Sequence, residues 1–124
     1  MKIQHLRIGN LVYFNGKQKE VGRVTGILES TTGENIISLN NRIDVSYLLN
    51  DIKPITITKD ILLKLGFKKC DMGGYKIYTD VYESIDFNSI LLCWVNEKKK
   101  PIKYVHDLQN LFFCLSRKEL TANL

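Results

Sequence analysis

The sequence predicts an α+β fold: a small curved β-barrel of the Src-homology type, then a helix, a short antiparallel sheet and a C-terminal amphipathic helix. Two observations lead to this fold class. Residues 11–55 contain five short segments rich in β-branched and aromatic residues, separated by turn residues. From residue 58 onward, apolar residues recur twice at helical spacing. We therefore expect two sub-units, residues 1–57 and residues 58–124, that share one core.

The N-terminal strands are expected at residues 11–17, 20–30, 36–39, 43–49 and 51–55. Asn15-Gly16 is the strongest short-range signal for a hairpin between the first two, and Asn40-Asn41 predicts another turn. Gly22 and Gly26 stand where the strands of small barrels bend. Strands this short are stable only when they close on one another or on the second sub-unit.

The second sub-unit is expected to start with a short helix, "KDILLKLGF" at residues 59–67. Thr58 precedes it as a capping residue, and Gly66 is the type of residue that ends helices. Tyr75, Ile77 and Thr79 alternate with more polar residues, which predicts a half-exposed strand. The nearly all-apolar "SILLCWV" at residues 89–95 predicts a central strand.

The last helix is expected to open at Pro101, a residue that suits the first helical position. Its wide apolar face is suited to lying across a sheet and consists of Tyr104, Val105, Leu108, Leu111, Phe112 and Leu115. His106, Gln109 and Asn110 form a polar flank beside this face. The sequence leaves two roles open for the flank: a functional site, or solvent contacts and hydrogen bonds at a sheet edge.

The composition is that of a soluble globular protein, with 44% hydrophobic and 25% charged residues among 124. No apolar stretch of about 18 residues exists, and the start "MKIQHLRIGN" is too polar for a secretory signal. We expect a cytoplasmic protein without a membrane partner. The cysteines Cys70, Cys93 and Cys114 are far apart and form no CxxC, which favours reduced thiols, the last two in the core.

No enzyme motif emerges from the sequence. The segment "DMGGY" has neither the GxGxxG spacing nor the lysine of a phosphate-binding loop. His106 and Asp107 are neighbours that point about 100° apart on a helix, so they cannot act as a catalytic pair. Neither His5 nor His106 has metal-ligand partners at a useful spacing. We therefore expect a non-enzymatic protein with no catalytic residue, no metal and no cofactor.

The net charge of +5 and the pI near 9.1 favour anionic partners. Basic and aromatic residues interleave along the predicted strands, a combination that suits base stacking and phosphate contacts on single-stranded nucleic acid. In the first hairpin, Tyr13 and Phe14 lie close in sequence to Lys17, Lys19 and Arg23. The run "EKKKPIK" is either a solvated loop or a phosphate-contacting one. The candidate residues for nucleic-acid or anion binding are Tyr13, Lys19, Arg23, Lys76, Tyr78, Lys98, Lys99, Lys100 and Lys103.

Four sequence blocks carry a family resemblance: "LRIGNLVYFNG" at 6–16, "IKPITIT" at 52–58, "LLKLGF" at 62–67 and "YVHDLQNLFFCL" at 104–115. In this order they span most of the chain. Together they resemble an uncharacterised family of small proteins from phages, prophages and conjugative elements of Bacteroidetes. Relatives often read Thr-Gly-Glu-Glu-Leu where this chain has "SRKEL" at 116–120. Arg117 thus stands in place of a glycine, which argues against a left-handed helix cap there.

The resemblance implies an accessory protein of a mobile element, and it assigns no catalytic residue. Our first hypothesis is a protein that binds nucleic acid through a basic and aromatic surface. The alternative is an anti-defence or host-interaction protein that binds a host protein or sequesters an anionic nucleotide signal. The sequence leaves the ligand open, and it allows a monomer or a homodimer formed through a sheet edge.

Overall fold

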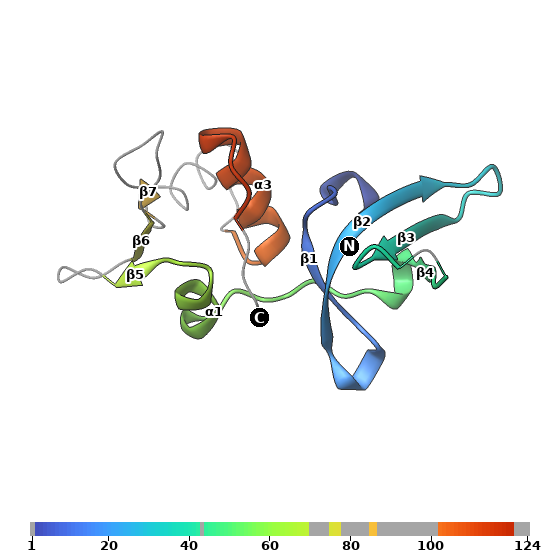
Figure 1. The fold of residues 1–124 in the computed structure, drawn as a ribbon, viewed down its shortest axis with the longest axis horizontal. Helices are drawn as coiled ribbons and strands as arrows, with labels where there is room; N and C mark the ends of the chain where they lie inside the picture. Colours follow the sequence, from blue (N-terminus) through green and yellow to red (C-terminus); the bar gives the residue numbers. More distant parts are fainter. Residues whose placement is uncertain (1, 43, 70–74, 78–84, 87–101, 121–124) are drawn as a thin grey trace. The chain divides into compact units, whose positions relative to one another are not determined.

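The computed structural model describes residues 2–42, 44–69, 75–77, 85–86 and 102–120 (Figure 1). The fold is mixed α+β, with a curved four-stranded antiparallel sheet and helices. The chain divides into two compact units. Unit 1 consists of Met1–Thr56 and Tyr104–His106, and unit 2 consists of Ile57–Lys103 and Asp107–Leu124. The chain therefore leaves unit 1 after Thr56, contributes Tyr104–His106 to it and ends in unit 2.

The sheet of unit 1 contains four antiparallel strands that are neighbours in chain order. They are β1 (Leu11–Phe14), β2 (Glu20–Glu29), β3 (Asn35–Leu39) and β4 (Tyr47–Leu48). A bulge between Val24 and Gly26 interrupts the pairing of β2 with β3, and bulges bend the strand that carries them. Figure 1 shows β2 curling along its length. The sheet encloses a core of Leu6, Val12, Val24, Ile37, Leu39 and Ile52.

The two predicted bending glycines differ in their roles. Gly26 adjoins the bulge, as expected of a residue at a bend. Gly22 lies instead beneath the side chains of Phe14 and Leu39, and a Cβ atom there would come within 3.1 Å of both. Gly22 is therefore needed for close packing on the core side of β2.

The hairpin predicted at Asn15-Gly16 forms, but its loop is longer than a two-residue turn. Phe14 pairs with Glu20, and a 3-10 turn, η2 (Gly16–Gln18), lies between them. The Asn15 side-chain amide donates a hydrogen bond to the Glu20 carboxylate across the base of the loop. This bond and the left-handed backbone at Asn15 and Lys19 (φ 61° and 47°) accommodate the extra residues.

The segment after β3 contains less strand than predicted. The turn at Asn40-Asn41 is confirmed by positive φ values of 55° and 60°. However, β4 covers only two residues, and a 3-10 turn, η3 (Leu49–Asp51), follows it. The reason is local, because the Asp51 carboxylate accepts a hydrogen bond from the Leu48 N–H at 3.2 Å and folds the chain into a turn. Within the expected strand at 51–55, Lys53 alone pairs with β1, through a single bridge to Tyr13.

The "RIGN" segment forms a turn that leads from the 3-10 turn η1 (Ile3–His5) into β1. Gly9 adopts a φ of 101°, and the buried Asn10 accepts a hydrogen bond from the Arg7 N–H at 2.8 Å through Oδ1. The Asn10 carbonyl also accepts one from the Val24 N–H at 2.8 Å. The buried Asn10 side chain thus closes the turn, and its backbone carbonyl joins the turn to β2.

In unit 2, the predicted short helix is present as α1 (Lys59–Lys64). Thr58 caps it by accepting a hydrogen bond from the Ile61 N–H at 3.2 Å. Gly66, at φ 99°, follows its end, and the Phe67 N–H donates back to the Leu62 carbonyl at 3.0 Å. This is a Schellman cap, and the side chains of Leu62 and Phe67 are both buried.

A three-stranded antiparallel sheet follows α1, with the order β5 (Lys68–Lys69), β6 (Tyr75–Ile77) and β7 (Ile85–Asp86). The strand expected at residues 89–95 lies outside the described residues, as do Cys70, Cys93 and Pro101. No helix in the described ranges is long and apolar enough to cross a membrane.

The last helix, α3 (Val105–Ser116), begins four residues later than predicted. The preceding backbone is extended, because the Ile57 N–H donates to the Lys103 carbonyl at 2.9 Å and the Val105 N–H donates to the Ile55 carbonyl at 2.8 Å. A helix starting at Pro101 would lose both bonds. Cys114 is exposed, so its expected place in the core is wrong.

The end of α3 also differs from the expectation. Arg117 adopts a left-handed φ of 58°, and its N–H donates to the Phe113 carbonyl at 2.7 Å. This is the single-bond left-handed cap, formed here without glycine.

Candidate nucleic-acid interface

Tyr13 and Lys53 lie side by side on the face of the β1–β2 sheet opposite the core cluster of Val12, Val24 and Ile52, which we call the outer face. Leu11 and Ile55, on the same face, are buried. Their backbones exchange two hydrogen bonds of 2.9 Å, and residues paired in this way project their side chains to the same side. Their chain neighbours Val12 and Ile52 point into the core, so Tyr13 and Lys53 point away from it. Tyr13 is half-buried and Lys53 is exposed.

Arg23 lies on the same outer face of β2. It pairs with Leu11, two residues along β1 from Tyr13, and residues two apart in a strand share a face. The Arg23 backbone is held by Asn40, whose Oδ1 accepts from the Arg23 N–H and whose N–H donates to the Arg23 carbonyl, both at 2.9 Å. Both the N–H and the carbonyl of Arg23 are therefore held by Asn40, while its side chain is exposed.

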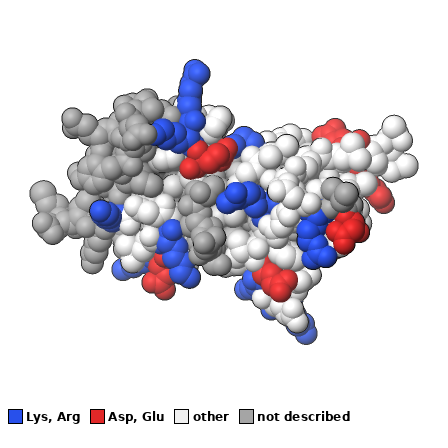
Figure 2. Space-filling view, viewed as in Figure 1, with Lys and Arg blue, Asp and Glu red and all other residues white. Residues whose placement is uncertain are grey.

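Lys17 and Lys19 extend this group of cations into the hairpin loop. Both are exposed, and Figure 2 shows Lys and Arg side chains at the tip of this hairpin. Lys19 adopts a left-handed φ of 47°, which costs a residue with a Cβ atom about 1 kcal/mol. The turn holds Lys19 in this conformation, because its N–H donates to the Gly16 carbonyl at 3.3 Å. We call Tyr13, Lys17, Lys19, Arg23 and Lys53 the basic-aromatic cluster.

Phe14, the other aromatic residue of the hairpin, does not belong to the cluster. It lies on the core side of β1, where its ring meets that of Tyr47 edge to face, with centroids 5.4 Å apart and planes at 66°. Tyr13 is therefore the aromatic residue of β1 that faces outward.

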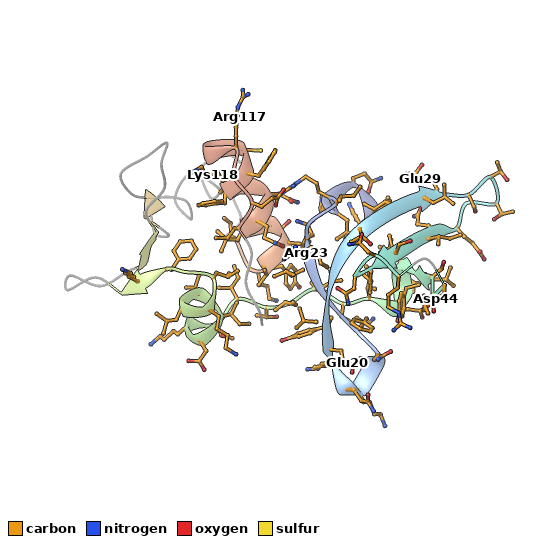
Figure 3. The ribbon with its side chains drawn as sticks, in the orientation of Figure 1. Glu20, Arg23, Glu29, Asp44, Arg117 and Lys118 are labelled. Atoms are coloured by element: carbon orange, nitrogen blue, oxygen red, sulfur yellow. The ribbon has the colours of Figure 1, made fainter. Side chains whose placement is uncertain are left out.

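Charge in unit 1 is segregated along the sheet. Residues 28–51 hold four carboxylates and a single cation, Arg42. The remainder of residues 2–56 holds six lysines and arginines and a single carboxylate, Glu20. Figure 3 shows Glu20 near the β1–β2 hairpin, and Glu29 and Asp44 toward the other end of the sheet. An approaching polyanion is therefore attracted to the end that carries the basic-aromatic cluster.

The other predicted binding residues belong to unit 2 or lie outside the described residues. Lys103 is exposed just before α3, and Lys76 lies in β6, with its backbone paired to Lys68 and Asp86. The predicted candidates outside the described residues are Tyr78, Lys98, Lys99 and Lys100.

Two members of the predicted polar flank are buried. Gln109 is fully buried, and its Nε2 atom donates to the Leu120 carbonyl at 2.8 Å, which ties the segment after α3 to the helix. His106 is 2% exposed and its ring stacks on that of Tyr104, with centroids 5.8 Å apart and planes at 11°. Asn110 is half-buried. Gln109 thus has a structural role, and neither it nor His106 presents a polar surface.

Lys53 is the cluster member that the sequence did not suggest. The alternation of apolar Ile52 with charged Lys53 indicates that Lys53 lies on the exposed side of this segment. It does not indicate which strand the segment pairs with, and therefore which residues lie beside Lys53. Since Lys53 pairs with Tyr13 across 40 positions of sequence, a local pattern cannot reveal the neighbourhood.

Within the described ranges, no group of three or more His, Cys, Asp or Glu side chains could hold a metal ion. Comparison with known proteins gives no match among family models, curated proteins or solved structures. The chemistry of the basic-aromatic cluster therefore carries the functional argument.

Proposed function

We propose that the protein binds single-stranded nucleic acid through the basic-aromatic cluster and has no catalytic activity. The observation that carries the proposal is the position of Tyr13, which lies beside Lys53 on the outer face and near Arg23. An outward tyrosine offers a platform on which an unpaired base stacks, and the surrounding cations contact phosphates. Bases inside a duplex cannot use such a platform, so single strands are the preferred ligand.

Two further considerations support this role. The resemblance of the four sequence blocks to proteins of Bacteroidetes phages and mobile elements suggests an accessory protein that acts in the cytoplasm of a bacterial host. We also propose that the curved sheet is a small barrel of the Src-homology type, a scaffold that lends itself to binding on strand faces and loops. That second argument is one of fold analogy.

Fluorescence anisotropy of labelled oligonucleotides of about 12 nucleotides, a length within the range that small barrels cover, tests the proposal. We expect single-stranded DNA or RNA to bind more tightly than a duplex. The logarithm of the affinity should fall linearly with the logarithm of salt concentration, by about 0.7 for each phosphate contact. Tyr13→Leu, which keeps an apolar side chain but removes the ring, should weaken binding by about 1–3 kcal/mol.

Lys19→Asn sharpens the test, because asparagine tolerates the left-handed backbone while the positive charge is lost. Lys59→Gln on α1 is the matched control, since it removes one exposed lysine from unit 2. We expect Lys19→Asn to lower both the affinity and the salt slope, and Lys59→Gln to change neither by as much. Equal losses would indicate nonspecific attraction, and no binding at low salt would direct the search to host proteins and anionic nucleotides.

A further inference from the structure

An aliphatic row crosses the outer face of the sheet at the end away from the basic-aromatic cluster. Leu28 pairs with Ile36, and Ile36 pairs with Leu48, so the three side chains project to one side across β2, β3 and β4. The next pairs along the strands, Ile27 with Ile37 and Ile37 with Tyr47, face the core instead. Leu28 is 61% exposed and Leu48 is 44% exposed, while Ile36 is half-buried. We call Leu28, Ile36 and Leu48 the aliphatic row.

Carboxylates lie in the turns that adjoin the aliphatic row. Glu34 lies in the turn between β2 and β3, where its N–H donates to the Ser30 hydroxyl at 3.1 Å. On the other side, Asp51 accepts a hydrogen bond from the Leu48 N–H. Asp44 is neutralised in part by Arg42, 3.5 Å away. Figure 2 shows acidic side chains at this end of the sheet.

We propose that the aliphatic row is a docking surface for a basic amphipathic helix of a partner protein. Neighbouring strands are about 4.8 Å apart, so three strands present a row about 10 Å wide, close to the diameter of a helix. The apolar stripe of such a helix covers Leu28, Ile36 and Leu48. Lysines or arginines beside the stripe meet Glu34 and Asp51, as in other helix-binding surfaces.

The acidic surroundings distinguish this surface from the basic-aromatic cluster. Carboxylates repel phosphates, so nucleic acid does not compete for the aliphatic row. β2 has ten residues, and one hairpin loop adjoins each of its ends. The protein can therefore hold nucleic acid at one end of β2 and a protein segment at the other. The docking proposal does not depend on the nucleic-acid proposal.

Methyl NMR of the full chain tests the docking surface. The probe is a synthetic helical peptide with leucines along one stripe and lysines on both sides of it, and the comparison peptide has glutamates in place of the lysines. We expect the lysine peptide to shift the methyl signals of Leu28, Ile36 and Leu48, and the glutamate peptide to bind at least about tenfold more weakly. Such a difference corresponds to about 1.4 kcal/mol of charge complementarity.

Variants distinguish binding at the aliphatic row from nonspecific hydrophobic binding elsewhere on the protein. Leu28→Ser and Leu48→Ser should each weaken the peptide about tenfold or more, because each removes a leucine that the peptide would bury. Leu63→Ser is the matched control, since Leu63 is 52% exposed on α1 of unit 2. Equal effects of the three variants, or equal binding of the two peptides, would overturn the proposal. Self-association that Leu28→Ser abolishes would also overturn it and assign the row to a second copy of the chain.

Discussion

Arg117 adopts a left-handed backbone conformation that glycine adopts far more readily than arginine. A left-handed φ of 58° brings the Arg117 N–H to the Phe113 carbonyl, but an L side chain crowds its own backbone there. We expect Arg117→Gly to raise the free energy of unfolding by about 1 kcal/mol, as measured by urea denaturation. Arg117→Ala is the control, because it removes the side chain but keeps the Cβ atom. An equal gain in both variants would show that the arginine side chain, not the backbone, is responsible.

The predictions for single residues succeeded where the residue type itself sets the local backbone. Asn40, Asn41 and Gly66 adopt positive φ as the sequence suggests, because glycine lacks a Cβ atom and asparagine tolerates that conformation better than other residues. The expectation at Arg117 was wrong and the left-handed Lys19 was not predicted, since a residue that resists a conformation can still be held in it by hydrogen bonds at the end of a helix or loop. The residue type shows which backbone conformation is preferred, but at Arg117 and Lys19 the hydrogen bonds determine the conformation.

At the level of the element, the packing of β2 depends on Gly22. A Cβ atom there would press on Phe14 and Leu39 from 3.1 Å, so we expect Gly22→Ala to lower the free energy of unfolding by about 1 kcal/mol or more. Gly26→Ala, whose Cβ would meet only Ser38 at 3.3 Å, should cost less. Chemical denaturation compares the two variants. Adding Phe14→Leu to Gly22→Ala should recover part of the loss if the contact with the ring is the cause.

Elements defined by local signals were predicted well, whereas those defined by distant pairing were not. The cap at Thr58 and the glycine at 66 place α1 correctly, because both act within a few residues. The start of α3 and the bridge at Lys53 depend on partners about 40 or more positions away. The same division holds in the candidate site: Tyr13, Lys19 and Arg23 follow from the pattern of one hairpin, but Lys53 does not.

At the level of the whole molecule, unit 1 is completed by a piece of chain from beyond residue 100. Both Ile55 and Val105 are fully buried, and the Val105 N–H donates to the Ile55 carbonyl. Val105→Pro removes this donor at the first position of α3, where helices accept proline. We expect it to lower the stability of unit 1 by about 1–3 kcal/mol, the typical effect of leaving a buried carbonyl without its partner.

Hydrogen exchange measures this loss at the amides of Tyr13 and Val24, whose hydrogen bonds lie within unit 1. Val105→Ala is the comparison, since it keeps the N–H and loses only side-chain volume. If proline reduces protection no more than alanine does, the hydrogen bond between Val105 and Ile55 contributes little to unit 1.

The return of the chain to unit 1 has a consequence during synthesis on the ribosome. The strands of the curved sheet emerge early, but Tyr104–His106 follow only after the whole of Ile57–Lys103 has been added. At about 5–20 residues per second, that interval lasts roughly 2 to 9 seconds. During this time the nascent unit 1 carries the aliphatic row, and the Ile55 carbonyl lacks its partner, the Val105 N–H. A ribosome that makes this chain therefore carries the curved sheet for several seconds before unit 1 is complete.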